Sequence, residues 1–167
     1  MNQKWEKDLV SILLLENKLI MKPIHILLVE DNEGDIFLIT EAFENTKLPN
    51  ILSVVRDGSE SLDFLGKNGI YCNVSQPDIL LLDINLPKIN GHEVLQFIKG
   101  NDSLKHIPVI MLTTSSSPHD INLAYKNYAN SYVIKPDGDK TFNDIVNNIE
   151  HFWISLASLP EKTSIIN

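Results

Sequence analysis

The sequence predicts an α/β protein with one domain: a five-stranded parallel sheet, doubly wound by helices on both faces. Five short apolar runs are typical of strands buried on both faces. Amphipathic segments of helical period separate these runs, and such alternation indicates a parallel sheet with right-handed crossovers. A chain of 167 residues is also the usual size of a single domain.

The expected elements alternate along the chain. The first apolar run, IHILLV at 24–29, precedes a segment at 33–46 with roughly helical apolar spacing. Further strands are expected at 51–55, 78–82, 107–112 and 131–134. Further helices are expected at 59–66, 91–99, 118–128 and 141–156. In the last helix we expect one apolar stripe, formed by Ile145, Ile149, Phe152 and Leu156, and the helix is either wrapped by core or meets a partner.

The segments outside this pattern are short. We expect residues 1–21 to be an N-terminal extension, either helical or disordered, residues 22–157 to form the domain, and residues 158–167 to form a tail. The extension contains an apolar run at 10–15 that is closed by Glu16, so it is too short for a membrane span. It either docks as a short helix or is dispensable, because Met21 directly precedes the first strand.

The charge composition argues against nucleic-acid binding. Fourteen basic and 22 acidic residues give a net charge of −8. Arg56 is the single arginine, whereas phosphate backbones are bound by clustered basic side chains.

The single cysteine, Cys72, cannot form an internal disulfide, which fits a cytoplasmic protein.

Polar residues directly follow four of the apolar runs. Glu30 and Asp31 follow the first run, Asp83 the third, Thr113 the fourth and Lys135 the fifth. A parallel sheet brings the carboxyl ends of its strands to one edge, where ligands bind. Polar residues are expected wherever a strand ends in water. That expectation does not explain why three carboxylates, a hydroxyl and a lysine occur together.

The combination predicts phosphoryl chemistry. Three adjacent carboxylates repel one another, and a divalent cation together with a lysine offsets that repulsion. Carboxylate oxygens are ligands that suit Mg²⁺. A hydroxyl and an ammonium beside the metal stabilise a phosphoryl group by charge, and Asp83 can act as the nucleophile that forms an aspartyl phosphate.

Four motifs resemble the receiver domain of two-component response regulators: VEDN at 29–32, LLDINLPKINGHEVL at 81–95, VIMLTTS at 109–115 and YVIKP at 132–136. The resemblance covers residues 22–153 and implies the flavodoxin-like strand order 2-1-3-4-5. The chain further resembles the stand-alone regulators that pair with cyanobacterial phytochromes, through VEDNEGD at 29–35, RDGSESLDFL at 56–65, DINLPKINGHEVL at 83–95 and the aromatic pair at 152–153.

The resemblance implies a role for each acidic residue. Asp83 corresponds to the phosphorylated aspartate, and Asp31 to the acid that binds Mg²⁺ directly. Glu30 corresponds to the neighbouring acid that acts through water. The backbone carbonyl of Asn85 corresponds to the remaining protein ligand.

The resemblance also implies the residues that respond to the phosphoryl group. Thr113 corresponds to the hydroxyl residue that hydrogen-bonds this group, and Lys135 to the lysine that pairs with it. Pro136 corresponds to a cis-proline. Tyr132 occupies the position of the aromatic switch residue on the fifth strand.

The resemblance implies a signalling protein that is not an enzyme and takes a phosphoryl group from a histidine kinase, here of the phytochrome type. About ten residues follow the last helix, so we expect no output domain. One alternative is an aspartate-nucleophile phosphohydrolase, but Asn85 stands where its DxDxT motif needs a general acid. Another is a binding module that works without phosphorylation.

Without an output domain, the signal must pass through the domain's own surface. The resemblance implies that this surface is built from the fourth helix, fifth strand and fifth helix. A two-fold homodimer is the simplest assembly of one self-complementary patch. The apolar side chains that we expect on this face are Tyr125, Tyr128, Phe142, Val146 and Trp153.

Overall fold

Five parallel strands form one sheet with the order β2-β1-β3-β4-β5, as expected. The structure is a computed structural model, and it describes residues 22–137 and 141–160. The predictions for residues 1–21 lie outside the described residues. The strands are β1 (Ile24–Val29), β2 (Asn50–Val55), β3 (Ile79–Leu82), β4 (Val109–Thr113) and β5 (Ser131–Ile134).

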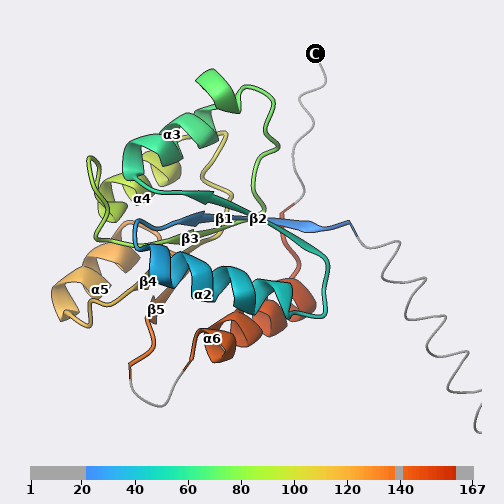
Figure 1. The fold of residues 1–167 in the computed structure, drawn as a ribbon. Helices are drawn as coiled ribbons and strands as arrows, with labels where there is room; N and C mark the ends of the chain where they lie inside the picture. The colour runs from blue at the N-terminus through green and yellow to red at the C-terminus, as the bar shows by residue number, and fades with distance from the viewer. Residues whose placement is uncertain (1–21, 138–140, 161–167) are drawn as a thin grey trace, which may run out of the picture.

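Helices cover both faces of the sheet (Figure 1). The α-helices are α2 (Glu33–Glu44), α3 (Gly58–Gly66), α4 (Gly91–Gly100), α5 (Pro118–Lys126) and α6 (Phe142–Ile149). Helices α3, α4 and α5 pack on one face, while α2 and α6 pack side by side on the other. A short 3-10 turn, η1 (Gly69–Tyr71), follows α3, and η2 (Glu150–Leu156) continues α6.

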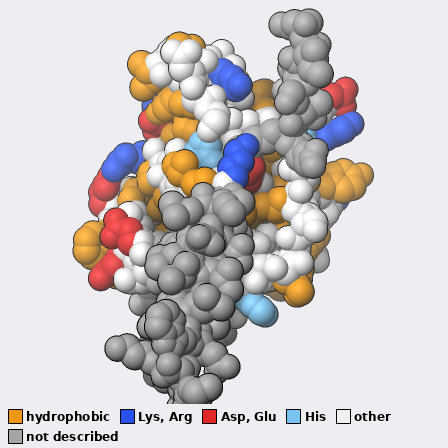
Figure 2. All heavy atoms as spheres, turned by 90° about the vertical axis from the view of Figure 1, so that its right-hand side faces the viewer, with side chains coloured by type: hydrophobic (Ala, Val, Ile, Leu, Met, Phe, Trp, Pro, Cys, Tyr) orange, Lys and Arg blue, Asp and Glu red, His pale blue; other side chains and the backbone are white. Residues whose placement is uncertain are grey.

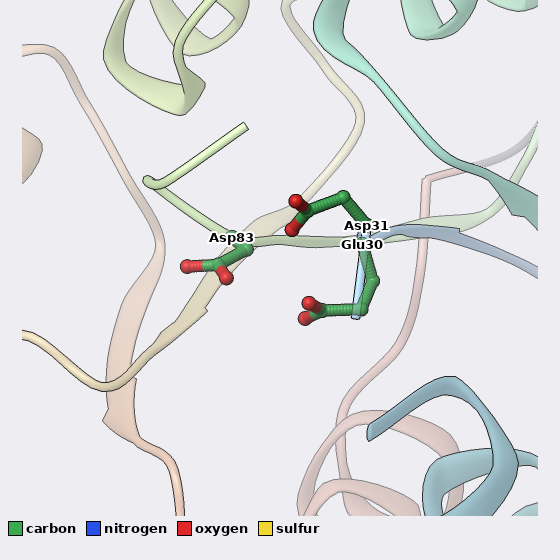
Figure 3. A group of neighbouring side chains, drawn as sticks. All are labelled: Glu30, Asp31 and Asp83. Carbon is green, nitrogen blue, oxygen red and sulfur yellow. The ribbon is translucent and has the colours of Figure 1, made fainter. Parts of the chain in front are cut away.

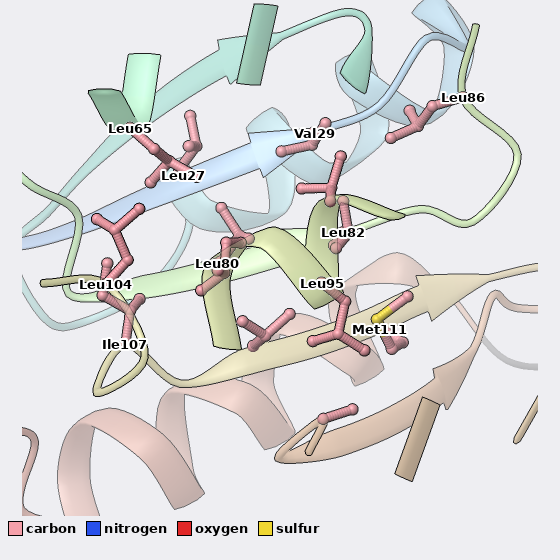
Figure 4. Close-up of a cluster of buried hydrophobic side chains, with 14 of the residues drawn as sticks. Leu27, Val29, Leu65, Leu80, Leu82, Leu86, Leu95, Leu104, Ile107 and Met111 are labelled. Carbon is pink, nitrogen blue, oxygen red and sulfur yellow. The ribbon is translucent and has the colours of Figure 1, made fainter. Parts of the chain in front are cut away.

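Two apolar clusters hold these layers together. The cluster on the α4 face joins strand residues such as Leu80 and Leu82 to Leu95 of α4 (Figure 4). The other cluster joins Ile26 and Leu28 of β1 to α2 and α6. Burial on both faces explains why the strands are continuous apolar runs instead of alternating ones.

Side-chain caps hold the starts of helices α2, α4 and α6. Asn32 Oδ1 accepts a hydrogen bond from Asp35 N and starts α2 directly after the acidic end of β1. Asn90 forms a capping box with Glu93 at the start of α4, and Thr141 forms one with Asp144 at the start of α6. The caps therefore place helix starts at the carboxyl edge of the sheet.

Several elements differ from the expected ones. Strand β4 begins at Val109 instead of residue 107, because Pro108 has no N–H to give to the sheet. Helix α5 ends at Lys126, and Tyr128, which we expected within it, has a φ of 64° in the left-handed region. The 3-10 turn at Gly69–Tyr71 had no counterpart among the expected elements.

The last helix also differs. It is an α-helix to Ile149 and a π-helix from Glu150 to Leu156, where bonds from i to i+5 widen the turn. Within the expected stripe, Ile145 and Ile149 are buried, whereas Phe152 and Leu156, which lie in the π-helix, are 51% and 68% exposed. The expected stripe of the last helix is therefore buried only in its first half.

The edge that carries the amino ends of the strands faces the viewer in Figure 2. There the described basic, acidic and apolar side chains are interspersed instead of gathered by type.

Within residues 22–137 and 141–160, no helix has the length and apolar character needed to cross a bilayer.

Candidate functional site

Lys135 brings the polar ends of three elements together. Its Nζ donates a hydrogen bond of 2.8 Å to Asp83 Oδ2, after β3. The same Nζ lies 2.6 Å from Glu30 Oε2, after β1, and 2.9 Å from Asp35 Oδ2, in the first turn of α2. The sheet therefore gathers Glu30, Asp83 and Lys135 at its carboxyl edge, as the sequence predicted.

Burial strengthens the charge interactions between Lys135 and its carboxylate partners. The side chains of Lys135 and Glu30 are 4% and 1% exposed. Burial raises the pKa of Glu30, although the nearby Lys135 ammonium opposes this shift. Burial lowers the pKa of Lys135, but the hydrogen bonds of Asp83, Glu30 and Asp35 outweigh it and raise this pKa above its usual value. Lys135 is therefore held as a cation.

Three carboxylates at this edge can hold a metal ion. Glu30, Asp31 and Asp83 each offer an oxygen, and these atoms all lie within 4.8 Å of one another. In Figure 3, Glu30 and Asp31 leave the end of β1 in different directions, with both carboxylates on the Asp83 side. Glu30 Oε2 is buried and is already paired with Lys135 Nζ at 2.6 Å, so a bound cation would share this carboxylate with the lysine. Hard oxygen donors of this kind fit Mg²⁺ or Mn²⁺.

Asp83 is fixed by its own loop. Its Oδ1 accepts hydrogen bonds from the backbone N–H groups of Ile84, at 2.6 Å, and Asn85, at 3.3 Å. The Asp83 side chain is 6% exposed. These bonds hold the carboxylate in place and stabilise its charge.

The sequence matches the family described as response regulator receiver domain over residues 26–147. The chain belongs to this receiver family. It is 41% identical over 135 residues to response regulator Rcp1 of Synechocystis, covering 81% of this chain and 92% of Rcp1. It is 42% identical over 140 residues to the probable methanogenesis regulatory protein FilR2 of Methanothrix harundinacea, covering 83% of this chain and 88% of FilR2.

Solved structures of cyanobacterial phytochrome regulators have the same fold. The phosphorylated cyanobacterial phytochrome response regulator RcpA superposes with a TM-score of 0.81 at 45% identity, covering 84% of this receiver and all of RcpA. The Mn²⁺-bound form of Rcp1 superposes with a TM-score of 0.79 at 40% identity, covering 83% of this receiver and all of Rcp1. The receiver is therefore similar to phytochrome response regulators in sequence and in fold.

The remaining predicted site residues lie at the same edge of the receiver. Thr113 is fully buried, and its carbonyl accepts a hydrogen bond of 2.8 Å from Lys135 N. Tyr132 OH donates a hydrogen bond of 2.9 Å to the carbonyl of Ser115. Asn85 is exposed next to Asp83. The metal-ligand role of the Asn85 carbonyl and the cis bond before Pro136 stay predictions.

Sequence reasoning missed two features of the receiver site. The contact of Asp35 with Lys135 was not expected, although Asp35 lies in the quoted motif at 29–35. The second feature is a set of contacts after β4, where Ser115 Oγ donates to Asp120 Oδ2 at 2.5 Å and His92 Nε2 lies 3.6 Å from Asp120 Oδ1. No sequence motif signals these contacts, because they join separate elements.

The expected apolar face of the receiver needs correction. Phe142 and Val146 are 8% and 1% exposed and pack in the core against the sheet, so the prediction that they lie on an exposed face is wrong. Their spacing explains the result, since buried residues of α6 recur at i, i+3, i+4 and i+7 and form one core stripe. Tyr125 and Tyr128 remain 51% and 77% exposed, and Trp153 is half-buried.

Proposed function

We propose that this chain is a stand-alone response regulator that accepts a phosphoryl group from a histidine kinase onto Asp83, with Mg²⁺, and signals by a change in its surface. One observation carries the proposal: the buried Lys135 ammonium lies 2.8 Å from a carboxylate that also belongs to a cluster suited to a divalent cation. Phosphoryl transfer needs positive charge beside the accepting carboxylate, and a fixed ammonium together with a metal ion would supply it.

The protein's own groups define the transfer step. One carboxylate oxygen of Asp83 attacks the phosphorus of a kinase phosphohistidine, a P–O bond forms, and the P–N bond to the imidazole breaks. The imidazole leaves with the electron pair of that bond and takes up a proton. Lys135 neutralises charge on the phosphoryl oxygens. A divalent cation held by Glu30, Asp31 and Asp83 supplies further positive charge to these oxygens.

The switch that follows uses the ends of β4 and β5. In our proposal the hydroxyl of Thr113 hydrogen-bonds the phosphoryl group, which draws the loop after β4 toward Asp83. Tyr132 follows that loop because its hydroxyl is bonded to the carbonyl of Ser115. The surface formed by α5, β5 and α6 changes as a consequence, without any enzymatic turnover of a second substrate.

The assignment of the donor rests on similarity. Two of the solved structures that resemble this chain are of RcpA, a phytochrome response regulator, and of Rcp1. We therefore propose a phytochrome-type histidine kinase as the phosphodonor and the cytoplasm as the location. Receiver domains take phosphoryl groups from histidine kinases, which supports the broader class of donor.

The proposed output is a homodimer through a corrected apolar face. An apolar groove runs between β5 and the end of α6, lined by residues that include Ile134, Phe152 and Trp153. Phe152 and Ile134 are 51% and 46% exposed, and aromatic side chains are frequent interface anchors. A second copy of the chain would cover both grooves with one two-fold contact.

Phosphotransfer from a purified kinase tests the proposal. A phytochrome-type histidine kinase is labelled with [γ-³²P]ATP, freed of nucleotide and mixed with the chain and Mg²⁺. We expect label to pass to the wild type within minutes and to be absent from Asp83→Asn. A set of other histidine kinases measures selectivity. Equal label on Asp83→Asn, or none on the wild type with any kinase, would contradict the proposal.

A further inference from the structure

Lys135 is surrounded by more carboxylates than the proposed transfer step uses. Asp83, Glu30 and Asp35 lie 2.8, 2.6 and 2.9 Å from its Nζ. An ammonium carries three hydrogens, so three acceptors can occupy all of them. In the proposed function Asp83 receives the phosphoryl group and Glu30 would help to hold the cation, whereas no step described so far involves Asp35.

The start of α2 fixes the position of Asp35. Its backbone N–H donates a hydrogen bond of 3.0 Å to Asn32 Oδ1, the cap of the helix. Asp35 therefore sits in the first helical turn, where an anionic side chain is also favoured by the helix dipole. Its side chain is 25% exposed, so keeping its charge costs less than it would in the buried core.

The three carboxylates that pair with Lys135 differ in whether they can also bind a metal ion. Glu30 and Asp83 both belong to the group of carboxylates that can hold a metal ion. Within the described residues, Asp35 is not a member of that group. Glu30 and Asp83 would hold a cation as well as the lysine, whereas Asp35 would serve the lysine alone.

A lysine needs a carboxylate partner to fix its position more than an arginine does. Its ammonium is a point charge on a flexible four-carbon stem, and holding it in one place costs side-chain entropy. Misplacement of a catalytic group by about 1 Å can cost on the order of a hundredfold in rate. A carboxylate outside the metal group can hold the ammonium at Asp83 throughout the reaction.

We propose that Asp35 is a positioning residue for phosphoryl transfer: its carboxylate holds the Lys135 ammonium beside Asp83 while Glu30 and Asp83 are engaged by the metal ion. This inference rests on the proposed function. Asp35 contacts neither the phosphoryl group nor the metal ion in this arrangement, so its effect passes entirely through Lys135.

Saturation kinetics with a small phosphodonor test the role of Asp35. Wild type, Asp35→Asn and Glu33→Gln are phosphorylated with acetyl phosphate at saturating Mg²⁺. Glu33→Gln is the matched control, because it removes one charge from the same helical turn while Glu33 pairs with Arg56 on the surface. We expect the maximal rate of Asp35→Asn to fall about tenfold. The half-saturating donor concentration and the Mg²⁺ affinity should change less than about threefold.

A double-mutant cycle separates positioning from a general effect of charge. In a Lys135→Ala background, Asp35→Asn should cause no further loss of rate, since the group that it positions is missing. Circular dichroism and urea unfolding confirm that each variant is folded, and Glu33→Gln should react like the wild type. If a variant with Lys135→Ala does not fold, the ¹⁵Nζ resonance of Lys135 gives the second readout, sharp in the wild type and broadened in Asp35→Asn.

The outcomes distinguish this inference from the proposed function. A wild type that takes no phosphoryl group overturns the proposed function itself. A phosphorylated wild type with an unchanged or faster Asp35→Asn overturns the positioning role alone. An equal loss of rate in Asp35→Asn and Glu33→Gln, or an additive loss in the Lys135→Ala background, also overturns it.

Discussion

Gly91 lies directly against the backbone carbonyl of Asp83. A Cβ added at Gly91 would be 2.0 Å from Asp83 O, far inside van der Waals contact. Gly91 is the first residue of α4, and its N–H also donates to the carbonyl of Ile84. The helix start and the loop of the proposed phosphoacceptor are therefore packed backbone to backbone.

This contact predicts that Gly91→Ala destabilises the protein. The clash is with backbone atoms, so relief requires α4 or the Asp83 loop to move, and overpacking of this kind costs about 2 kcal/mol. Gly100→Ala in the same helix is the control, because an added Cβ there meets nothing within 4 Å. Urea unfolding should show a lower midpoint for Gly91→Ala and an equal or higher one for Gly100→Ala. Equal midpoints for wild type and Gly91→Ala would refute the close contact.

Asp31→Asn should abolish Mg²⁺ binding without lowering stability. Asp31 is exposed and belongs to the metal group, and Mg²⁺ has few other protein oxygens at this edge. Isothermal titration calorimetry should show saturable binding for the wild type and for Glu33→Gln, and none for Asp31→Asn. Undiminished binding in Asp31→Asn would mean that the ion sits elsewhere.

Tyr71 should stabilise the fold only below alkaline pH. Its hydroxyl donates to Glu60 Oε1 at 2.5 Å, and this bond raises the pKa of Tyr71 from 10.0 to about 12. The stabilisation is fully present below the unfolded pKa and is lost as pH rises through the folded one, because the unfolded chain loses its proton first. The difference in unfolding free energy between wild type and Tyr71→Phe should therefore shrink between about pH 9 and 12. A difference that stays constant over this interval would contradict the bond.

Phe152→Ser should weaken the proposed dimer. Phe152 lines the groove beside β5, whereas Phe37, which is 66% exposed on α2, lies on another surface and serves as control. Light scattering over a concentration series should show a monomer–dimer equilibrium for the wild type and Phe37→Ser. The dissociation constant should rise at least about tenfold in Phe152→Ser. A wild type that stays monomeric at high concentration, phosphorylated or not, rules out the dimer.

The carboxyl edge of the sheet could be predicted from sequence because chain order and parallel pairing determine it. Glu30, Asp83 and Lys135 each follow an apolar run, and parallel topology leaves them no other edge. Their convergence needs no knowledge of helix packing. The strand order 2-1-3-4-5 came from the family resemblance, and the structure confirms it.

The burial and contacts of helix side chains were harder to predict from the sequence. Phe142 and Val146 were assigned to the surface although they complete a core stripe with Ile145 and Ile149. Phe152 lies in the π-helix after Ile149 and is 51% exposed, and no residue pattern that we recognise signals this π-helix. The contact of Asp35 with Lys135 depends on how the first turn of α2 meets β5, which strand order alone does not specify.

The mass of the intact protein after incubation with acetyl phosphate and Mg²⁺ tests the central claim most directly. We expect the wild type to gain one phosphoryl group, and Asp63→Asn, which changes an aspartate on α3, to do the same. Asp83→Asn should gain none, and excess chelator should stop the reaction of the wild type. A phosphoryl group on Asp83→Asn in the same yield as on the wild type would contradict the assignment of Asp83 as the phosphoacceptor.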